Sequence, residues 1–349
     1  MRRWTALAAG VALVAAPTAH AHPEHGTPGG TPPAAVYGDG WKPLAPIAGG
    51  PRQEHSVAAL DGRVYVIGGV VPNAGGGVVT TDQVEVYDPR TDRWSEAAPL
   101  PVAMNHPNVA AVGGRLYVVG GLSGGTSWRA LRDSFVYDPR TDRWTALPPM
   151  PAGTERGSAA MGVRGTKIYL AGGMRTLTPG PGGLQDTVDA VSSYDVVTGR
   201  WESLPSLPEA RDHVGGAILG STFYVLGGRD RGQANVRDTV YALDLRTRRW
   251  TGRAPMPTAR GGIATAVVGH RIHAFGGEGN HAPGANGVFA EHEVYDPARD
   301  RWERLAPMPV PRHGTAAVAV GGTIHLPGGG VTGGAGPVAV NDAYRPGSR

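Results

Sequence analysis

Short hydrophobic runs that end in a pair of glycines recur along the whole chain. The six runs read VYVIGG, LYVVGG, IYLAGG, FYVLGG, IHAFGG and IHLPGG, and their glycine pairs begin at positions 68, 120, 172, 227, 276 and 328. The pairs follow one another at intervals of 52, 52, 55, 49 and 52 residues. Apolar runs this short, bounded by glycine and polar loops, predict β-strands, and their regular spacing predicts an internal repeat.

The stretches around each glycine pair keep one order. An alternating run of small and apolar residues, such as HSVAAL, precedes the pair, and a polar loop follows it. A strand with a tyrosine comes next, then a turn and a tryptophan. The tyrosines are Tyr87, Tyr137, Tyr194, Tyr241, Tyr295 and Tyr344, and the tryptophans are Trp94, Trp144, Trp201, Trp250 and Trp302. Four short strands in a period of about 50 residues are typical of one blade of a β-propeller.

The sixth repeat is divided between the two ends of the chain. It stops at NDAYRPGSR without a tryptophan, whereas Trp41 lies 53 residues before Trp94, which is one period. We therefore expect the N-terminal strand to complete the blade begun by residues 311 to 344. Joining the two ends in this way leaves no open edge strand at the junction.

The positions of the glycine pairs, tyrosines and tryptophans resemble the Kelch repeat, over roughly residues 37 to 346. The resemblance implies an all-β fold, a six-bladed Kelch β-propeller closed by the N-terminal strand. It also implies that each tyrosine and tryptophan packs within its blade and against the neighbouring blade. The segment YDPRTDRW occurs twice, at 87–94 and 137–144, and its Asp and Pro suit a tight turn. We interpret it as a structural segment rather than a binding motif, because other repeats form the same turn with different residues, YDVVTGRW and ALDLRTRRW.

The N-terminus has the pattern of an export signal. Residues 1–21 contain two arginines, then an apolar and alanine-rich run, and then the small-residue site Ala19-His20-Ala21. Residues 22–36 are rich in Pro and Gly and are expected to form a flexible lead-in. We expect a secreted or periplasmic protein with no membrane span in its mature form. The chain has no cysteine, so packing and hydrogen bonds must hold it together without disulfides.

Composition excludes some function classes. The formal net charge is +4, and the arginines are scattered rather than clustered, which gives nucleic-acid binding little support. The chain contains no H-E-x-x-H, EF-hand or G-x-S-x-G motif. A loose metal ion could bind His22-Pro-Glu-His25, but such tails often bind metal without function. The expectation is therefore no metal site and no cofactor.

One set of arginines is a candidate binding site. Alignment of the repeats on their glycine pairs puts Arg52, Arg211, Arg260 and Arg312 at one position, with Arg156 one residue off. The second repeat departs from this pattern, with Met104 at the position and His106 two residues on. Arginines around one channel mouth would favour an anionic group, as they do in some eukaryotic Kelch adaptors that grip acidic peptides. The alternative is that these arginines pair with backbone carbonyls or local acids.

The loops that follow the glycine pairs supply the other candidates, because function concentrates on variable loops. They contribute Trp128, Arg229, Glu278 and His281. Trp128 lies outside the repeat positions, and it is either a cap on the blade edge or a stacking platform.

Two functions remain open. The first is a secreted binding protein, expected as a monomer, that recognises a partner protein, a peptide or a glycan at the mouth of the central channel. The second is a sugar-acid epimerase or mutarotase that resembles N-acetylneuraminate epimerase, with Glu278 and either Arg260 or Arg312 as the catalytic pair. The galactose oxidase reaction is excluded because it needs a cysteine, and no sialidase Asp-box is present. Nothing in the sequence demands a reaction, so binding is favoured.

Overall fold

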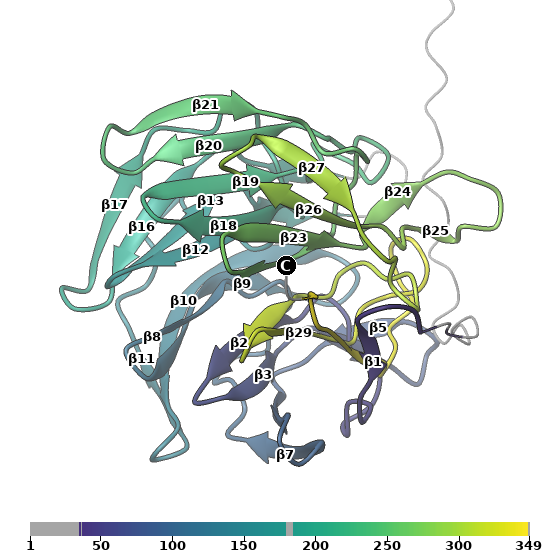
Figure 1. Cartoon of the computed structure of the whole chain (residues 1–349). Helices are drawn as coiled ribbons and strands as arrows, with labels where there is room; N and C mark the ends of the chain where they lie inside the picture. The colour runs from purple at the N-terminus through teal and green to yellow at the C-terminus, as the bar shows by residue number, and fades with distance from the viewer. Residues whose placement is uncertain (1–34, 36, 179–183, 348–349) are drawn as a thin grey trace, which may run out of the picture.

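The described residues form six antiparallel blades of four strands each. Two further strands join the sheet of one blade, and two short two-stranded hairpins lie outside the blade sheets. The structure is a computed structural model that describes residues 35, 37–178 and 184–347, and none of these residues is helical. The export signal and the lead-in fall almost entirely outside the described residues. Figure 1 shows the sheets following one another in sequence order around a common centre, from the N-terminal to the C-terminal end of the colour scale. The innermost strands of successive sheets contact one another in a closed cycle, in the order β2 (Ser56–Leu60), β8 (Val109–Val112), β12 (Ala160–Arg164), β18 (Gly215–Leu219), β22 (Ala264–Val268) and β28 (Val318–Val320).

Each blade runs from its innermost to its outermost strand. The first blade has β2 (Ser56–Leu60), β3 (Arg63–Ile67), β6 (Val84–Asp88) and β7 (Arg93–Ala97). The second has β8 (Val109–Val112), β9 (Arg115–Ser123), β10 (Trp128–Asp138) and β11 (Arg143–Ala146). The third has β12 (Ala160–Arg164), β13 (Lys167–Ala171), β16 (Val191–Asp195) and β17 (Arg200–Leu204).

The other three blades repeat this order. The fourth has β18 (Gly215–Leu219), β19 (Thr222–Leu226), β20 (Val240–Asp244) and β21 (Arg249–Arg253). The fifth has β22 (Ala264–Val268), β23 (Arg271–Phe275), β26 (His292–Asp296) and β27 (Arg301–Arg304). The sixth has β28 (Val318–Val320), β29 (Thr323–Pro327), β30 (Asn341–Tyr344) and β1 (Trp41–Pro43).

Three short hairpin additions follow glycine pairs. They are β4 (Val70–Pro72) with β5 (Val78–Thr80), β14 (Met174–Leu177) with β15 (Gln185–Thr187), and β24 (Glu278–Asn280) with β25 (Gly287–Val288). The apolar cores lie between neighbouring blades rather than within one sheet. No described residue belongs to a helix that could cross a membrane.

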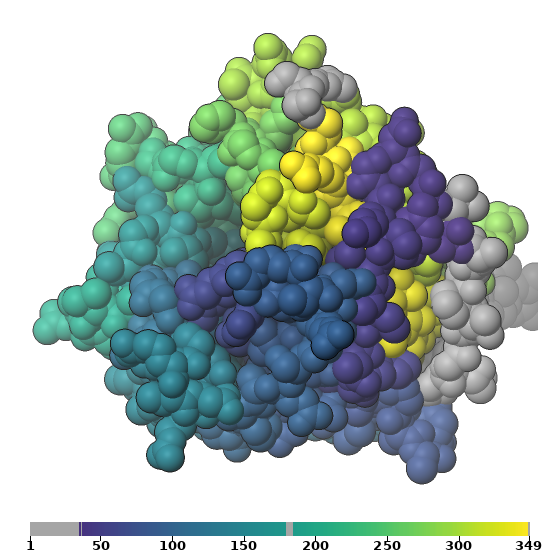
Figure 2. All heavy atoms as spheres, turned by 60° about the horizontal axis from the view of Figure 1, so that its bottom comes forward, coloured from purple at the N-terminus to yellow at the C-terminus, as the bar shows by residue number. Residues whose placement is uncertain are grey.

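The N-terminal strand closes the ring, as the sequence predicts. Strand β1 pairs with β30, and Trp41 lies opposite Tyr344. Figure 2 shows the N-terminal segment packed directly against the C-terminal segment. Trp41 is buried, and its indole Nε1 donates a hydrogen bond of 3.0 Å to the carbonyl of Ala306 in the fifth blade. The end of the chain is therefore held to its beginning by a sheet pairing and an aromatic anchor.

The repeated tyrosine and tryptophan residues fasten one blade to the next. Trp94 Nε1 donates to the carbonyl of Ala45 in the preceding blade, at 2.9 Å. The Tyr87 hydroxyl donates to Asp92 at 2.6 Å, and the same carboxylate oxygen accepts the Ala45 amide at 2.9 Å. Burial and this hydrogen bond raise the pKa of Tyr87. Tyr137, Asp142 and Trp144 repeat these contacts. The segment YDPRTDRW therefore holds neighbouring blades together, in agreement with its interpretation as a structural segment.

Candidate functional site

A closed ring of backbone hydrogen bonds surrounds the propeller axis. Each blade contributes one residue, and the amide of each donates to the carbonyl of its equivalent in the preceding blade at 2.7 to 3.2 Å. The six residues of this axial ring are Glu54, His106, Ser158, His213, Gly262 and Gly314. Each precedes the innermost strand of its blade, so the sheets place all six around one point.

All six ring residues have a positive φ, between 47° and 62°. Glycine adopts this conformation freely, and two blades use it. For other residues such backbone strain costs on the order of 1–3 kcal/mol, and it tends to persist at functional sites. Four blades nevertheless carry a side chain here.

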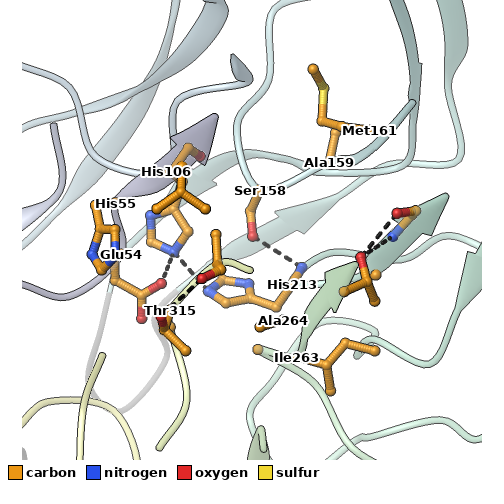
Figure 3. A pocket seen from close by; sticks show the side chains of 18 of the residues that line it. Glu54, His55, His106, Ser158, Ala159, Met161, His213, Ile263, Ala264 and Thr315 are labelled. Carbon is orange, nitrogen blue, oxygen red and sulfur yellow. Dashed lines mark hydrogen bonds and ion pairs between the residues drawn. The ribbon is translucent and has the colours of Figure 1, made fainter. Parts of the chain in front are cut away.

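Three of those side chains meet on the axis. A carboxylate oxygen of Glu54 lies 2.8 Å from His106 Nε2, and His106 Nε2 lies 2.9 Å from His213 Nε2 (Figure 3). All three residues are buried. Their ligand atoms lie within 4.8 Å of one another, a spacing at which they could share a metal ion. We call these residues the axial triad.

A buried polar network holds the triad in place. Asp212 Oδ1 accepts a hydrogen bond from His213 Nδ1 at 2.7 Å. Arg229 contacts His213 Nε2 through Nη2 at 3.0 Å, Asp212 through Nε at 3.1 Å, and Glu278 through Nη1. His313 Nδ1 lies 3.5 Å from Glu278 and 3.8 Å from Glu54.

The surroundings fix the charge states of these groups. Burial opposes ionisation of Glu54, but the nearby imidazoles of His106, His213 and His313 outweigh it and hold the carboxyl pKa well below its usual range. Burial likewise opposes ionisation of Glu278, and chiefly Arg229 overcomes it, which lowers the pKa. Burial, followed by the charge of Arg229, lowers the pKa of His213. The carboxylates are therefore ionised and His213 is neutral at neutral pH.

A cavity of about 240 Å³ begins at the triad. Its lining mixes apolar side chains such as Val57, Val109 and Ile263 with polar ones such as Ser56, Thr265 and Thr315, and the triad and Ser158 also line it. The lining residues run from the axial ring along the innermost strands. The second strand of each blade is antiparallel to the innermost strand, so it ends level with the axial ring. The loops after the glycine pairs therefore lie on the side of the axial ring that faces away from the cavity.

The arginine set does not lie at the channel mouth, which corrects the predicted placement. Arg52, Arg156, Arg211, Arg260 and Arg312 are at most 1% exposed. Arg52 bonds Glu85 at 2.7 Å, Arg260 bonds Glu293 at 2.5 Å, and Arg312 bonds Asp342 at 2.7 Å. A buried cation needs such partners, so these contacts follow the alternative in which arginines pair with local acids and carbonyls.

The remaining two arginines of the set bond within the blades as well. Arg211 donates to the carbonyl of Gly227 at 2.9 Å, and Arg156 donates to the carbonyl of Thr154 at 2.7 Å and to Ser192 Oγ at 2.8 Å. Arg156 is also in register with the others, because an axial-ring residue follows two positions after each arginine of the set.

The loop candidates have different outcomes. Arg229 and Glu278 belong to the polar network, and the Trp128 ring lies 5.0 Å from the ring of His106. Trp128 Nε1 donates to the carbonyl of Gly125, so its ring packs on the triad while its polar edge is bonded within its own loop. His281 is exposed and outside the network.

The proposed catalytic pairing needs correction too. Glu278 pairs with Arg229, whereas Arg260 and Arg312 pair with acids of their own blades. His22 and His25 lie outside the described residues.

Sequence reasoning missed the triad. Its members lie far apart in the chain, and none of them belongs to a local motif. The available signal was the position two residues after the aligned arginine, where the six repeats read Glu, His, Ser, His, Gly and Gly. Equivalent positions of the six blades lie around the same axis, so a comparison of this position across the repeats would have predicted that Glu54, His106 and His213 lie close together.

Comparison with known proteins decides the family. The KLHDC2/KLHL20/DRC7 Kelch-repeats domain matches residues 41–173 and 180–329. The chain belongs to the Kelch-repeat family. The solved structure of YjhT superposes with a TM-score of 0.68 at 16% identity, over 86% of this chain and 95% of that chain, which supports the propeller fold.

Curated Kelch relatives differ in how much of them the chain matches. Kelch-like protein terF of Aspergillus terreus is 44% identical over 298 residues, 85% of this chain and 65% of that protein. Kelch-like protein 35 of Mus musculus is 26% identical over 51% of this chain and 27% of that protein. N-acetylneuraminate epimerase of Shigella sonnei is 34% identical over 84 residues, 24% of this chain and 23% of the enzyme. The chain thus spans less than two thirds of each of these relatives.

Proposed function

We propose that the chain is an exported binding protein that takes one small polar unit of its ligand into the central channel. The unit is the end of a glycan or of a peptide. Kelch propellers generally bind protein partners, and the chain is a Kelch propeller. The observation that carries the proposal is the cavity of about 240 Å³, whose lining mixes apolar side chains with hydroxyl, imidazole and carboxylate groups.

The chemistry of the cavity supports a small unit rather than a folded surface. Ligand sites in proteins are concave and mostly apolar, with a few polar groups that set orientation. Here Val57, Val109 and Ile263 belong to the apolar part of the lining, and Glu54, His106 and Ser158 belong to its polar part. A volume on this scale accommodates one sugar or one terminal residue.

The contacts favour binding over the epimerase alternative. A sugar acid would need a cation free to hold its carboxylate beside Glu278. Arg229 is the guanidinium that contacts Glu278, and it already bonds Asp212, Glu278 and His213. The alternative retains a direct test by NMR, in which purified residues 22–349 are mixed with sialic acid. Unchanged α/β anomer exchange would exclude it.

The binding proposal is tested with a matched pair of variants. Val57→Phe fills the cavity, and Val197→Phe adds the same atoms at an outer turn, where Val197 is 74% exposed. Purified residues 22–349 are screened on a glycan array and on a peptide array with free termini. We expect hits that lose at least tenfold in affinity in Val57→Phe and keep it in Val197→Phe. Hits that are unaffected by Val57→Phe, or no hits on either array, would contradict the proposal.

Export is tested separately with the full chain. N-terminal sequencing of protein recovered outside the cytoplasm of a bacterial host should begin at His22. Retention of an uncleaved chain in the cytoplasm would contradict it and would leave the binding test intact.

A further inference from the structure

The axial triad brings two imidazole Nε2 atoms and one carboxylate group together. His213 Nδ1 lies 2.7 Å from a carboxylate oxygen of Asp212, which can only accept a hydrogen bond, so the proton of a neutral His213 is on Nδ1. His106 Nδ1 lies 2.7 Å from Asn105 Oδ1, whose amide is oriented by donation from Nδ2 to Thr80 at 2.7 Å. The Nε2 atom of neutral His213 therefore carries a lone pair, and the Nε2 atoms of the two rings face each other and the Glu54 carboxylate.

Nitrogen and oxygen atoms that lie 2.8 to 2.9 Å apart need a shared proton or a metal cation among them. This arrangement also reproduces the way proteins hold metal-binding imidazoles. A histidine that binds a metal through one ring nitrogen usually donates from the other to a carboxylate or carbonyl oxygen, which sets its tautomer and orientation. Asp212 and Asn105 occupy those supporting positions.

The charge of the network points the same way. The network contains the three carboxylates of Glu54, Asp212 and Glu278 and one guanidinium, that of Arg229, so the carboxylates outnumber the guanidinium by two. All four residues are at most 5% exposed. Burying unbalanced charge is strongly unfavourable, and a divalent cation would balance this network.

The backbone strain supplies independent support. Glu54, His106 and His213 hold a positive φ where the fifth and sixth blades use glycine. The side chains are thus kept at a cost on the axis, where they converge. Their backbones are tied into the hydrogen-bonded axial ring, which holds the three ligand atoms in one arrangement.

We infer that Glu54, His106 and His213 form a binding site for one divalent transition-metal ion. Two imidazoles and a carboxylate are ligands suited to ions from Fe²⁺ to Zn²⁺, and three protein ligands leave coordination positions open. Those positions would face the cavity, which the same three residues line. In the metal-free protein, Arg229 Nη2 donates to His213 Nε2, and this hydrogen bond is lost when the ion binds.

The chain itself provides matched test variants. Glycine is the natural residue at the equivalent positions 262 and 314, so Glu54→Gly, His106→Gly and His213→Gly should all fold. Ser158→Gly makes the same backbone change at the fourth strained position without removing a triad ligand. His22→Ala with His25→Ala removes the other histidines suggested by the sequence. Unfolding midpoints confirm that each variant is folded.

The experiment measures metal directly and needs no substrate. Chelator-stripped protein is dialysed against Mn²⁺, Fe²⁺ under anaerobic conditions, Co²⁺, Cu²⁺ or Zn²⁺, and bound metal is counted by mass spectrometry. We expect one ion per chain for at least one metal, with visible d–d absorption if Co²⁺ binds. Each triad glycine variant should lose on the order of 100-fold in affinity, whereas Ser158→Gly and the His22/His25 variant should match the unaltered protein.

Three outcomes would overturn the inference. They are less than half an ion per chain with every metal, unchanged affinity in the triad variants, and loss of binding only in the His22/His25 variant. In the first outcome the triad is held together by protons on its imidazoles. Ligand capture in the array experiment is a separate readout, so a metal-free protein can still bind a glycan or peptide.

Discussion

The outer turn and the axial ring share a left-handed backbone conformation but use it differently. In the outer turn, Asp92, Asp142 and Asp300 have φ of 53°, 50° and 49°, and each accepts a tyrosine hydroxyl and an amide of the preceding blade. In the ring, equivalent positions carry Glu, His, Ser, His, Gly and Gly. Identical residues at equivalent positions of the outer turn hold neighbouring blades together. Different residues at equivalent positions of the axial ring form a site that no single blade could contain.

Ring closure gives the largest expected effect on the architectural side of this comparison. Trp41→Ala removes a buried indole and its bond to Ala306, and we expect a loss of about 3–5 kcal/mol in the free energy of unfolding. Urea denaturation measures it, with Val197→Ala as an exposed control. An unchanged midpoint in Trp41→Ala would mean that the N-terminal strand does not stabilise the ring.

Histidine at a position where most repeats have tyrosine should make the stability of the fold depend on pH. The second strand carries Tyr65, Tyr117, Tyr169 and Tyr224 in four blades but His273 and His325 in the other two. Burial, alone for His325 and reinforced by Arg271 for His273, lowers both pKa values to about 4.

The unfolded chain therefore binds protons below about pH 6.5 while the folded chain does not, and stability falls as pH falls towards 4. Each of these two histidines should cost about 1.4 kcal/mol at pH 5.5, about 3 kcal/mol together. His325→Tyr restores the repeat residue and should remove its share of the loss. Parallel pH curves for the variant and the unaltered protein, measured by urea denaturation from pH 7 to 5.5, would refute this assignment.

Glycine substitutions at the two positive-φ positions compare the regions directly. Asp142→Gly keeps the conformation but removes the acceptor for Tyr137 and Ala98, and should cost about 1–2 kcal/mol. Ser158→Gly relieves strain and removes the hydroxyl that accepts from the His213 amide, but this amide still bonds the carbonyl of residue 158, so stability should change by less than about 1 kcal/mol. Thermal unfolding compares them, with Asp142→Asn keeping one acceptor. Equal losses in both glycine variants would remove the distinction between the outer turn and the axial ring.

The smallest effect is expected at the exposed arginine of the repeated segment. The Arg140 side chain is 78% exposed and contacts Asp138 of its own turn. Arg140→Ala should leave the thermal unfolding midpoint unchanged and leave array binding unchanged. A loss of ligand binding in this variant would assign function to the outer turn after all.

The sequence predicted which arginines are equivalent, but it did not predict the direction in which their side chains point. The aligned arginines were found from the repeat, but their destination depends on which way each side chain leaves the strand. Arg260 turns into its blade towards Glu293, 33 positions later in the chain. Alignment reveals equivalent positions, whereas burial and pairing are settled only when the blade is packed.

The sequence by itself determined the six blades, their register and the closure by Trp41, because glycine pairs, tyrosines and tryptophans act through local turns and neighbouring strands. Only the tertiary structure brought together Glu54, His106 and His213, which come from three blades and meet on the axis. These three residues come close together only when the six blades have closed into a ring. The pattern of residues along the chain does not reveal distances across that ring.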